Sequence, residues 1–242
     1  MVHHMWPGNH NPRTISLQRQ LERRAHQAAV SQALARALPS CAKAVLPNPF
    51  DDRIFFVNGN MSRDRDILFV GRLIPQKGAH ILIDAISRLE PKEHSISVTV
   101  AGEGPERAQL QTLITARGLN GCIQLHGQVT GAGLAELFNQ HRIVVVPSIH
   151  PEAFGLVALE AVACGCVVMA SNAGGLPEAI GLCGVTFPAG DAASLSETLQ
   201  DLLCSPHEMN RFRATADQHL AKHRPGVVAR RYTNMIRKSC GK

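Results

Sequence analysis

The chain has 242 residues, of which 45% are hydrophobic, and it carries a formal net charge of +6 at pH 7. This length is enough to bury a domain core, and no apolar run reaches the 18 residues of a membrane-spanning helix. The positive charge suits nucleic acid, an anionic lipid surface or an anionic small molecule, but aromatic residues make up only 4% and no nucleic-acid-binding motif is present, which argues against nucleic acid.

Residues 1–43 differ in pattern from the rest of the chain. Most of the stretch 13–38 is predicted to be helical and charged, with an interruption at 29–31. The first residues contain no apolar core segment, so they do not read as a signal peptide. The basic, weakly amphipathic stretch 16–25 either lies on a membrane surface or, as is commoner, packs on its own protein with a solvated face.

Three histidines near the start, His3, His4 and His10, could be interpreted as a metal cluster. A flexible terminus is the favoured interpretation, since chain ends are commonly poorly ordered.

From residue 44 onward, short β-branched runs alternate with longer segments of helical periodicity. An extended, proline-containing linker is predicted at 44–51. Strands are predicted at 66–70, 96–101, 123–126, 143–147, 167–170 and 184–187. Helices are predicted at 78–89, 105–117, 133–139, 154–164, 194–204, 208–222 and 226–238. This alternation predicts an α/β fold with a Rossmann-like parallel sheet that has helices on both faces.

Glycine or proline falls at the carboxyl ends of four of the predicted strands, at Gly71, Gly102, Gly127 and Pro147. Parallel α/β sheets bind their ligands beyond the carboxyl ends of the strands. The sequence therefore predicts a single binding site at one edge of the sheet.

Cysteine and aspartate pairs do not predict a metal site. The seven cysteines are odd in number and lack paired spacing, which fits a reducing cytoplasm. Cys164 and Cys166 fall where a helix runs into a strand, and small buried side chains are favoured over a metal or redox pair. Asp64 and Asp66 lie at the opposite end of the sheet from the predicted site, where a solvated turn is favoured.

The stretch 147–178, with the sequence PSIHPEAFGLVALEAVACGCVVMASNAGGLPE, is the most informative part of the chain. Glu152 lies in the loop before a predicted helix and Glu160 lies on the helix, about 12 Å away at the helical rise. Carboxylates suit hydroxyl groups because they accept directional hydrogen bonds. An apolar helix would bury Glu160 at a cost unless a ligand or an internal cation pairs with it.

The start of the same helix suits a diphosphate. Its first backbone N–H groups lack intrahelical acceptors and point at the ligand position, and a glycine there lets backbone approach the ligand closely. The residues concerned are Phe154, Gly155, Leu156 and Val157. Together with the two carboxylates, they predict a clamp for a nucleotide sugar. Glu178 has two open interpretations, one as a functional residue and one as a cap for the preceding glycine turn.

Four motifs in register resemble the donor-binding half of family 4 glycosyltransferases, which are retaining enzymes of the GT-B fold. They are Glu152-x7-Glu160 with the GGLPE that follows at 174–178, GRLIPQKG at 71–78, AGEGP at 101–105 and GQV at 127–129. The resemblance covers about residues 44–203. It implies transfer of a hexose-type sugar from a UDP- or GDP-sugar to a glycan or lipid-linked acceptor, with retention of configuration, in polysaccharide or glycoconjugate biosynthesis.

The resemblance also implies roles for individual residues. Arg72 and Lys77 would stabilise the departing diphosphate and Glu152 would hold sugar hydroxyls, so these three are the candidate catalytic residues. Glu160 would hold the ribose diol. No metal or other cofactor is implied, because protein cations replace the metal. The further donor-binding candidates are Gly71, Val129, Phe154, Gly155, Leu156 and Val157.

The resemblance divides the chain into three parts. Residues 1–43 are expected to be a remnant of the acceptor domain, 44–225 the nucleotide-sugar-binding domain and 226–242 a C-terminal helix. Most of the acceptor domain is expected to be missing, and a partner chain could supply it. The expected location is the cytoplasm, with peripheral contact to the inner face of the membrane left open.

Three functional interpretations follow. The first is a glycosyltransferase that needs the missing half. The second is a truncated or regulatory nucleotide-sugar-binding domain without catalysis of its own. The third is a sugar-nucleotide epimerase of related fold, against which the helix of Glu160 argues. The sequence identifies neither the nucleotide, the sugar, the acceptor nor the oligomeric state.

Overall fold

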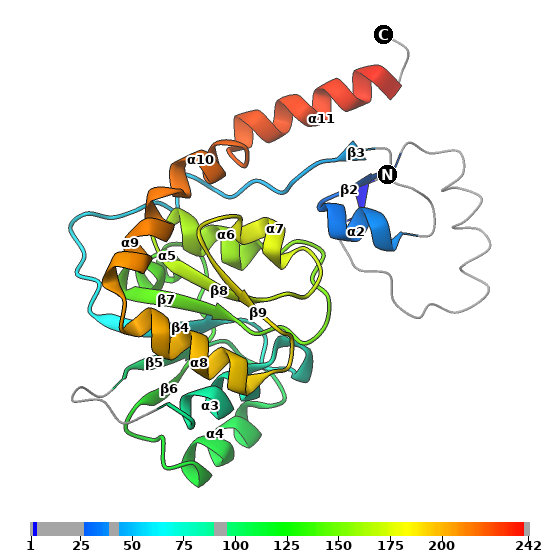
Figure 1. Cartoon of the computed structure of the whole chain (residues 1–242). Helices are drawn as coiled ribbons and strands as arrows, with labels where there is room; N and C mark the ends of the chain where they lie inside the picture. Colours follow the sequence, from blue (N-terminus) through cyan, green and yellow to red (C-terminus); the bar gives the residue numbers. More distant parts are fainter. Residues whose placement is uncertain (1, 4–26, 39–43, 90–95, 240–242) are drawn as a thin grey trace, which may run out of the picture.

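The computed structural model describes residues 2–3, 27–38, 44–89 and 96–239. Within this part of the chain, two parallel sheets form: one of six strands and a small one of three. Figure 1 shows the larger sheet wrapped by helices and the smaller one beside it, near the C-terminal helix.

The large sheet carries the core of the molecule. Its strands pair in parallel throughout, in the order β6-β5-β4-β7-β8-β9. Most of them are apolar along their length because helices cover both faces. The strands are β4 (Arg65–Val70), β5 (Val98–Ala101), β6 (Ile123–Gly127), β7 (His141–Val146), β8 (Val167–Ser171) and β9 (Gly184–Phe187). All six predicted strands are confirmed, with ends shifted by at most two residues.

Two layers of helices enclose the sheet. One face packs against α3 (Ala79–Ile86), α4 (Arg107–Ala116) and α8 (Ala192–Leu203), through side chains such as Leu82, Leu110 and Leu195. The other packs against α5 (Gly131–Gln140), α6 (Leu156–Ala163) and α7 (Leu176–Ile180). The predicted fold class, a Rossmann-like parallel sheet with helices on both faces, is confirmed (Figure 1).

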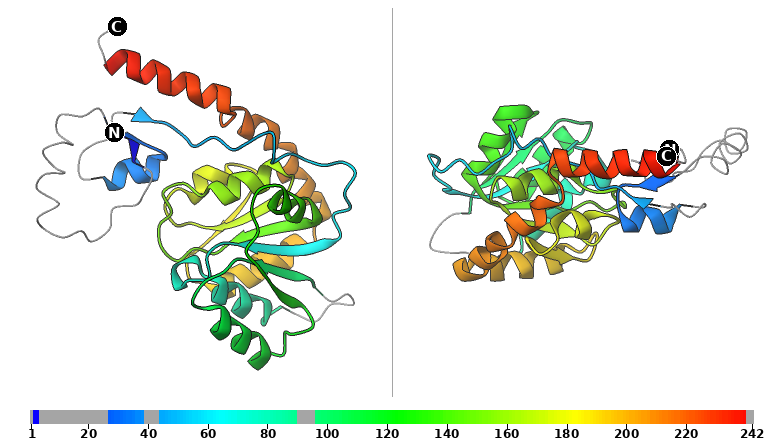
Figure 2. Two further views of the ribbon diagram at one scale, coloured as in Figure 1. Left: turned by 180° about the vertical axis from the view of Figure 1, so that it is seen from behind. Right: turned by 90° about the horizontal axis from the view of Figure 1, so that it is seen from above.

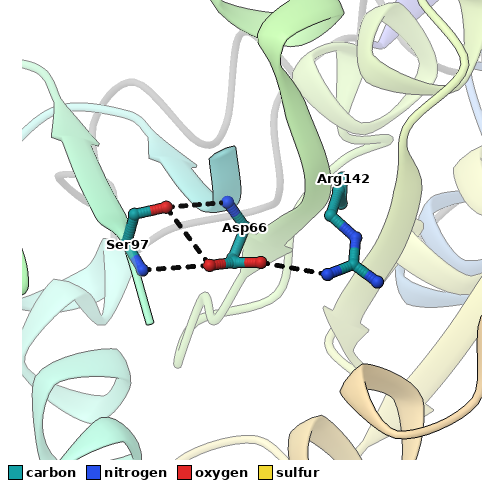
Figure 3. A network of polar contacts seen from close by, with 3 residues as sticks. All are labelled: Asp66, Ser97 and Arg142. Carbon is teal, nitrogen blue, oxygen red and sulfur yellow. Dashed lines mark hydrogen bonds and ion pairs between the residues drawn. The ribbon is translucent and has the colours of Figure 1, made fainter. Parts of the chain in front are cut away.

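A polar network fixes the amino ends of the central strands (Figure 3). The Asp66 carboxylate accepts a hydrogen bond from the backbone N–H of Ser97 at 3.1 Å and forms an ion pair with Arg142 at 3.1 Å. The backbone N–H of Asp66 donates to Ser97 Oγ at 2.9 Å. Asp66 therefore connects β4 to both neighbouring strands. The expected solvated turn fits only Asp64, which is exposed.

The C-terminal part is helical but is divided differently from the prediction. The single helix predicted at 208–222 is wrong, because α9 (Pro206–Ala214) and α10 (Ala216–Ala221) meet at Thr215. The Thr215 hydroxyl donates to the carbonyls of Phe212 and Leu182 at 2.8 and 2.9 Å, which offers the backbone an alternative to a continuous helix. The last helix, α11 (Pro225–Ser239), agrees with the prediction at 226–238 to within one residue at each end.

The small sheet brings three short segments together. In it, β2 (Ala28–Ala29) pairs with both β1 (Val2–His3) and β3 (Ala44–Val45). The interruption expected at 29–31 overlaps the end of β2, which is followed by α2 (Gln32–Ala37). The interpretation of His3 as part of a flexible terminus is wrong, since it lies in β1; His4 and His10 lie outside the described residues. The predicted domain boundary at residue 44 falls at the start of β3.

Helix α7 was missed by the sequence analysis. The residues GGLPE read as a turn, yet Pro177 stands in the first turn of the helix, where a missing N–H costs nothing and its fixed φ suits the helix.

The C-terminal helix α11 runs from the large sheet toward the small one in both views of Figure 2. Of the helices in the described part of the chain, none combines the length and apolarity needed to cross a membrane.

Two glycines with nearly equal φ angles allow a test of how closely the loop before α3 approaches its neighbour. Gly78 has φ +71° and Gly118 has φ +70°. A Cβ on Gly78 would collide with the carbonyl oxygen of Pro147, whereas a Cβ on Gly118 would meet nothing within 4 Å. Both alanine variants carry left-handed strain of about 1–2 kcal/mol. Gly78→Ala should lower the free energy of unfolding by a further ~1–3 kcal/mol, because the collision overpacks the site.

Urea unfolding of the wild type and both variants measures this difference. Equal decreases in the free energy of unfolding for Gly78→Ala and Gly118→Ala would contradict the close approach of Gly78 to the carbonyl of Pro147.

Candidate functional site

The order of the strands reverses between β4 and β7. From β4 the chain proceeds to β5 and β6 on one side, while β7 proceeds to β8 and β9 on the other. Open α/β sheets bind ligands at such a switch point, beyond the carboxyl ends of the strands. Residues 71–78 follow β4 and residues 147–155 follow β7. Two of the four sequence motifs therefore flank the expected ligand position.

The loops at this edge of the sheet bond to one another, and we call them the strand-end belt. The belt comprises residues 71–78, 101–106, 127–129, 147–155 and 171–178. On the β5 side, the N–H of Gly102 donates to the carbonyl of Gly127 at 2.7 Å, and the N–H of Leu73 donates to the carbonyl of Glu103 at 2.8 Å. The motif that contains Gly71 is thereby bonded to the loop after β5, which in turn bonds to the loop after β6.

The belt continues across the switch point to the other side of the sheet. The backbone N–H of Ile149 donates to the carbonyl of Gln76 at 2.9 Å, which joins the loops after β4 and β7. The buried Ser171 hydroxyl donates to the carbonyl of Ser148 at 2.6 Å. The predicted convergence of the motifs on one edge is therefore seen in backbone hydrogen bonds.

Lys77 and Glu152 form one network within the belt. The Lys77 ammonium forms an ion pair with Glu152 Oε1, and the Ser148 hydroxyl donates to the same oxygen at 2.6 Å. The side chains of Lys77 and Glu152 are 28% and 21% exposed, so both groups still reach the surface. An ammonium group has three donors, which leaves Lys77 with donors for a ligand while it orients the carboxylate. The sequence analysis gave Ser148 no role; its spacing of four residues from Glu152 was the available signal.

Glu160 differs from Glu152 in having no hydrogen-bond or ion-pair partner among the described residues. It lies in the second turn of α6, where burial raises the pKa of its carboxyl group to about 7. A desolvated carboxylate is costly unless something pairs with it. The structure supplies no internal cation for Glu160 within its described part, and such a cation was one of the two options left by the sequence.

Helix α6 begins later than predicted. The expectation of a helix from residue 154 is wrong, because Gly155 is the N-cap with φ +106° and the first helical residue is Leu156. No side chain in the described part of the chain caps this end, so the N–H groups of Leu156 and Val157 are available to an anion. Phe154 is only 4% exposed, and its ring packs against His223 with centroids 5.4 Å apart, so its side chain belongs to the core.

The remaining candidates occupy different surroundings. Arg72 is exposed at the end of β4 and forms no ion pair with another described residue, so its guanidinium is available to a ligand. Gly71 precedes it, and its N–H bonds to the carbonyl of Ala101 at 3.1 Å. Val129 is half-buried and packs against the core of the α5–α6 face, which leaves its backbone as the part that could meet a ligand. Leu156 is 40% exposed on the same helix face as Glu160.

Metal and redox interpretations find no support in the described residues. No group of three or more His, Cys, Asp or Glu side chains among them could hold a metal ion. Cys164 and Cys166 are buried, and burial raises the pKa of the Cys166 thiol to about 11. Cys166 Sγ donates to the carbonyl of Phe138 at 2.9 Å, and Arg63 donates to the carbonyl of Cys164 at 2.6 Å. The favoured interpretation of these cysteines as small buried side chains is confirmed.

A cavity of about 510 Å³ lies elsewhere, between β3 and α11. Among the residues that the structure describes, its lining contains no acidic residue and no residue of the belt. The lining residues are Gln27, Ala44, Val45, Leu46, Arg231, Asn234, Met235, Lys238 and Ser239.

Comparisons with known proteins agree with this location of the site. The family model described as glycosyl transferases group 1 matches residues 50–219, which include the whole belt. Glycogen synthase of Mycobacterium tuberculosis is 35% identical over 157 residues, 64% of this chain and 38% of the relative. D-inositol 3-phosphate glycosyltransferase of Arthrobacter sp. is 35% identical over 171 residues, 67% of this chain and 40% of the relative. The chain thus spans about two fifths of the length of these relatives.

Solved structures show the same fold at low sequence identity. Anabaena HepE in complex with UDP has a TM-score of 0.83 and 23% identity, over 98% of this chain and 71% of HepE. A glycosyltransferase from Rickettsia africae has a TM-score of 0.83 and 19% identity, over 98% of this chain and 69% of that protein. The GT-B-like Rossmann fold expected from the sequence is confirmed by these neighbours.

The raised pKa of Glu160 makes stability depend on pH. The carboxyl group has a pKa of about 7 in the folded chain and an ordinary value of 4.5. Between these values the folded chain binds more protons than the unfolded chain, so this group's contribution to stability is present below about pH 4.5 and is lost as the pH rises toward 7. Glu160→Gln cannot ionise, so its free energy of unfolding relative to wild type should increase from about pH 5 to about pH 8.

Urea unfolding at the two pH values measures this change. Glu197→Gln, an exposed site on α8, is the matched control and should show the same difference from wild type at both. A pH-independent difference for Glu160→Gln would rule out the raised pKa.

Proposed function

We propose that this chain, which belongs to the glycosyl transferases group 1 family, binds a nucleoside diphosphate sugar at the strand-end belt and takes part in transfer of the hexose. The observation that carries the proposal is the combination of two carboxylates with different surroundings on one loop–helix unit. Glu152 is held by Lys77 and Ser148, whereas Glu160 is half-buried and pairs with no described residue.

The cations and the start of α6 define the proposed diphosphate position. Breaking the bond between the anomeric carbon and the phosphate oxygen leaves negative charge on the departing diphosphate. Arg72 offers a planar fork and Lys77 a point charge, and both suit phosphate oxygens. The uncapped N–H groups of Leu156 and Val157 add a preorganised electropositive end. This arrangement supports a transfer that relies on protein cations rather than on a metal.

The two carboxylates receive different parts of the donor. Glu152 would accept hydrogen bonds from sugar hydroxyls, and its ion pair with Lys77 holds it beside the diphosphate position. Glu160, one turn into α6, would accept hydrogen bonds from the ribose diol. The diol donates two hydrogen bonds to a carboxylate that otherwise has none, which offsets the cost of burying it.

Uracil is supported as the base by structural neighbours. The HepE structures contain UDP and UDP-glucose. Backbone at residues 127–129 would contact the base, because Gly127 has φ +89° and Val129 directs its side chain into the core. A guanine base remains an outcome of the test below.

The finer assignment is to family 4 retaining enzymes with a glycan or lipid-linked acceptor, in polysaccharide or glycoconjugate biosynthesis. Glu152-x7-Glu160 and the Arg72–Lys77 loop support it. Residues 28–37 and β3 would then be the end of an acceptor domain whose remainder comes from elsewhere in a longer protein or from a partner chain. Peripheral contact with the cytoplasmic face of a membrane belongs to the same proposal.

A second candidate function is nucleotide-sugar binding without transfer by this chain. The chain covers 38–40% of the two curated relatives named above, and the groups proposed for the site would all contact the donor. The two candidates share the donor site and differ in whether an acceptor site is completed.

Calorimetric titration of the chain with UDP, GDP, UDP-glucose and uridine tests the donor site. We expect saturable binding of one diphosphate, with uridine much weaker because it lacks the groups that Arg72 and Lys77 contact. Glu160→Ala should weaken the binding of that diphosphate by about tenfold or more, the effect of losing charge-assisted hydrogen bonds. Glu197→Ala, at an exposed site on α8, should bind like the wild type.

Absence of binding to every nucleotide would refute the proposed function. Binding that Glu160→Ala leaves intact would place the nucleotide elsewhere.

A further inference from the structure

Glu178 makes a long-range contact that could not be predicted from the GGLPE motif in which it lies. It lies in α7, yet its two carboxylate oxygens accept hydrogen bonds from the backbone N–H groups of Gln32 and Ala33, both at 2.8 Å. These groups open α2, more than 140 residues earlier in the chain. Figures 1 and 2 show α2 and α7 side by side. The two interpretations left open by the sequence, a cap for the glycine turn or a functional residue, did not include this contact.

The contact completes the hydrogen bonding of the first turn of α2. The N–H groups of Gln32 and Ala33 bond to Glu178, the N–H of Leu34 bonds to Ser31 Oγ at 3.0 Å, and the N–H of Ala35 bonds to the carbonyl of Ser31 at 3.0 Å. The first N–H groups of an α-helix have no acceptors within the helix, so those of Gln32, Ala33 and Leu34 need side-chain acceptors. A carboxylate at this end is also favoured by the helix dipole. The start of α2 thus depends on a residue of the large domain.

A second bond joins the same segment to the sugar-binding loop. Ser31 Oγ donates to the carbonyl of Ala153 at 2.6 Å. Ala153 directly follows Glu152, the residue proposed to hold the sugar. Ser31 is 1% exposed, so this bond is shielded from water.

The turn before α7 closes the connection from the other side. The backbone N–H of Gly175 donates to the carbonyl of Glu152 at 2.7 Å. Gly174 and Glu152 form an isolated parallel bridge, and a Cβ on Gly174 would collide with the Glu152 carbonyl oxygen. Segment 31–33, loop 152–153 and turn 174–178 therefore meet at one three-way junction that holds the backbone of Glu152.

We propose that Glu178 is a positioning residue that couples the segment 28–37 to the sugar-binding loop. Through it, the position of this segment sets the orientation of Glu152, and binding of the sugar stabilises the junction in return. The proposal rests on the proposed function for its ligand. It assigns Glu178 to the sugar part of donor binding, not to the nucleotide part, because Glu160 and Arg72 lie outside the junction.

Amide hydrogen exchange tests the junction without a ligand. In Glu178→Ala, the amides of Gln32 and Ala33 lose their acceptor and should exchange about tenfold faster or more. The amide of Gly175, which bonds to the Glu152 carbonyl, should also exchange faster if the junction is coupled. Glu178→Gln retains one acceptor oxygen and should restore part of the protection. Glu197→Ala is the control and should leave all three amides unchanged.

Donor titration tests the consequence for the site. The wild type should bind UDP-glucose more tightly than UDP, and Glu178→Ala should reduce this difference while its affinity for UDP stays within about twofold of the wild type. Loss of affinity for both ligands to the same extent would indicate general destabilisation and overturn the proposal. Glu178→Gln, which preserves shape and one acceptor, gives the comparison if Glu178→Ala does not fold.

These experiments distinguish failure of the proposed function from failure of the positioning role of Glu178. If the wild-type chain binds neither UDP nor UDP-glucose, the proposed function fails, while exchange at Gln32, Ala33 and Gly175 still decides whether Glu178 holds the junction. If binding is normal and exchange at these amides is unchanged in Glu178→Ala, the donor site stands and the role of Glu178 is refuted.

Discussion

The candidate site depends on backbone contacts between loops that are far apart in the sequence. Each loop of the strand-end belt bonds to a neighbouring one, from Gly127 through Gly102 to the loop after β4, and from there across the switch point to the loop after β7. Side chains at Gly78 or Gly174 would collide with the facing carbonyl groups. Glycine therefore serves here to bring backbone against backbone, and the charged side chains occupy positions that this packing sets.

On that support, the two glutamates have opposite electrostatic surroundings. Glu152 forms an ion pair with Lys77 and accepts a hydrogen bond from the Ser148 hydroxyl near the surface. Glu160 is largely shielded from water and has no partner among the described residues. A purely structural role explains Glu152, which forms an ion pair. It does not explain Glu160, because burying an unpaired carboxyl group destabilises the fold. A ligand with two hydroxyl groups near a diphosphate accounts for both residues at once.

The sequence predicted most of the large domain because its signals are local. The last four residues of β7 and the first four of β8 are apolar runs, and the glycines at the strand ends mark the loops of the site. The predicted start of α6 was two residues early, because the left-handed conformation of Gly155 cannot be read from an apolar pattern. Helix α7 was missed for a related reason: glycines and a proline predict a turn as well as a helix start.

Long-range contacts were beyond local patterns. The bonds of Glu178 to Gln32 and Ala33 cross more than 140 residues, and the bond of Ser31 to Ala153 crosses 122. Neither has a periodic signal on either segment. Those contacts depend on how the small sheet and the belt pack together, and they give the segment before the large domain a defined relation to Glu152. The resemblance to the glycosyltransferase family indicated which motifs matter, but not that relation.

Hydrogen exchange of the whole chain with and without UDP-glucose tests the central claim, that the separate loops of the belt form one donor site. The account predicts that the ligand slows exchange at amides of residues 71–78, 127–129 and 152–157 together, and leaves the amino ends of the strands near Asp66 and Arg142 unchanged. Protection confined to the cavity between β3 and α11, or to one loop of the belt alone, would contradict it.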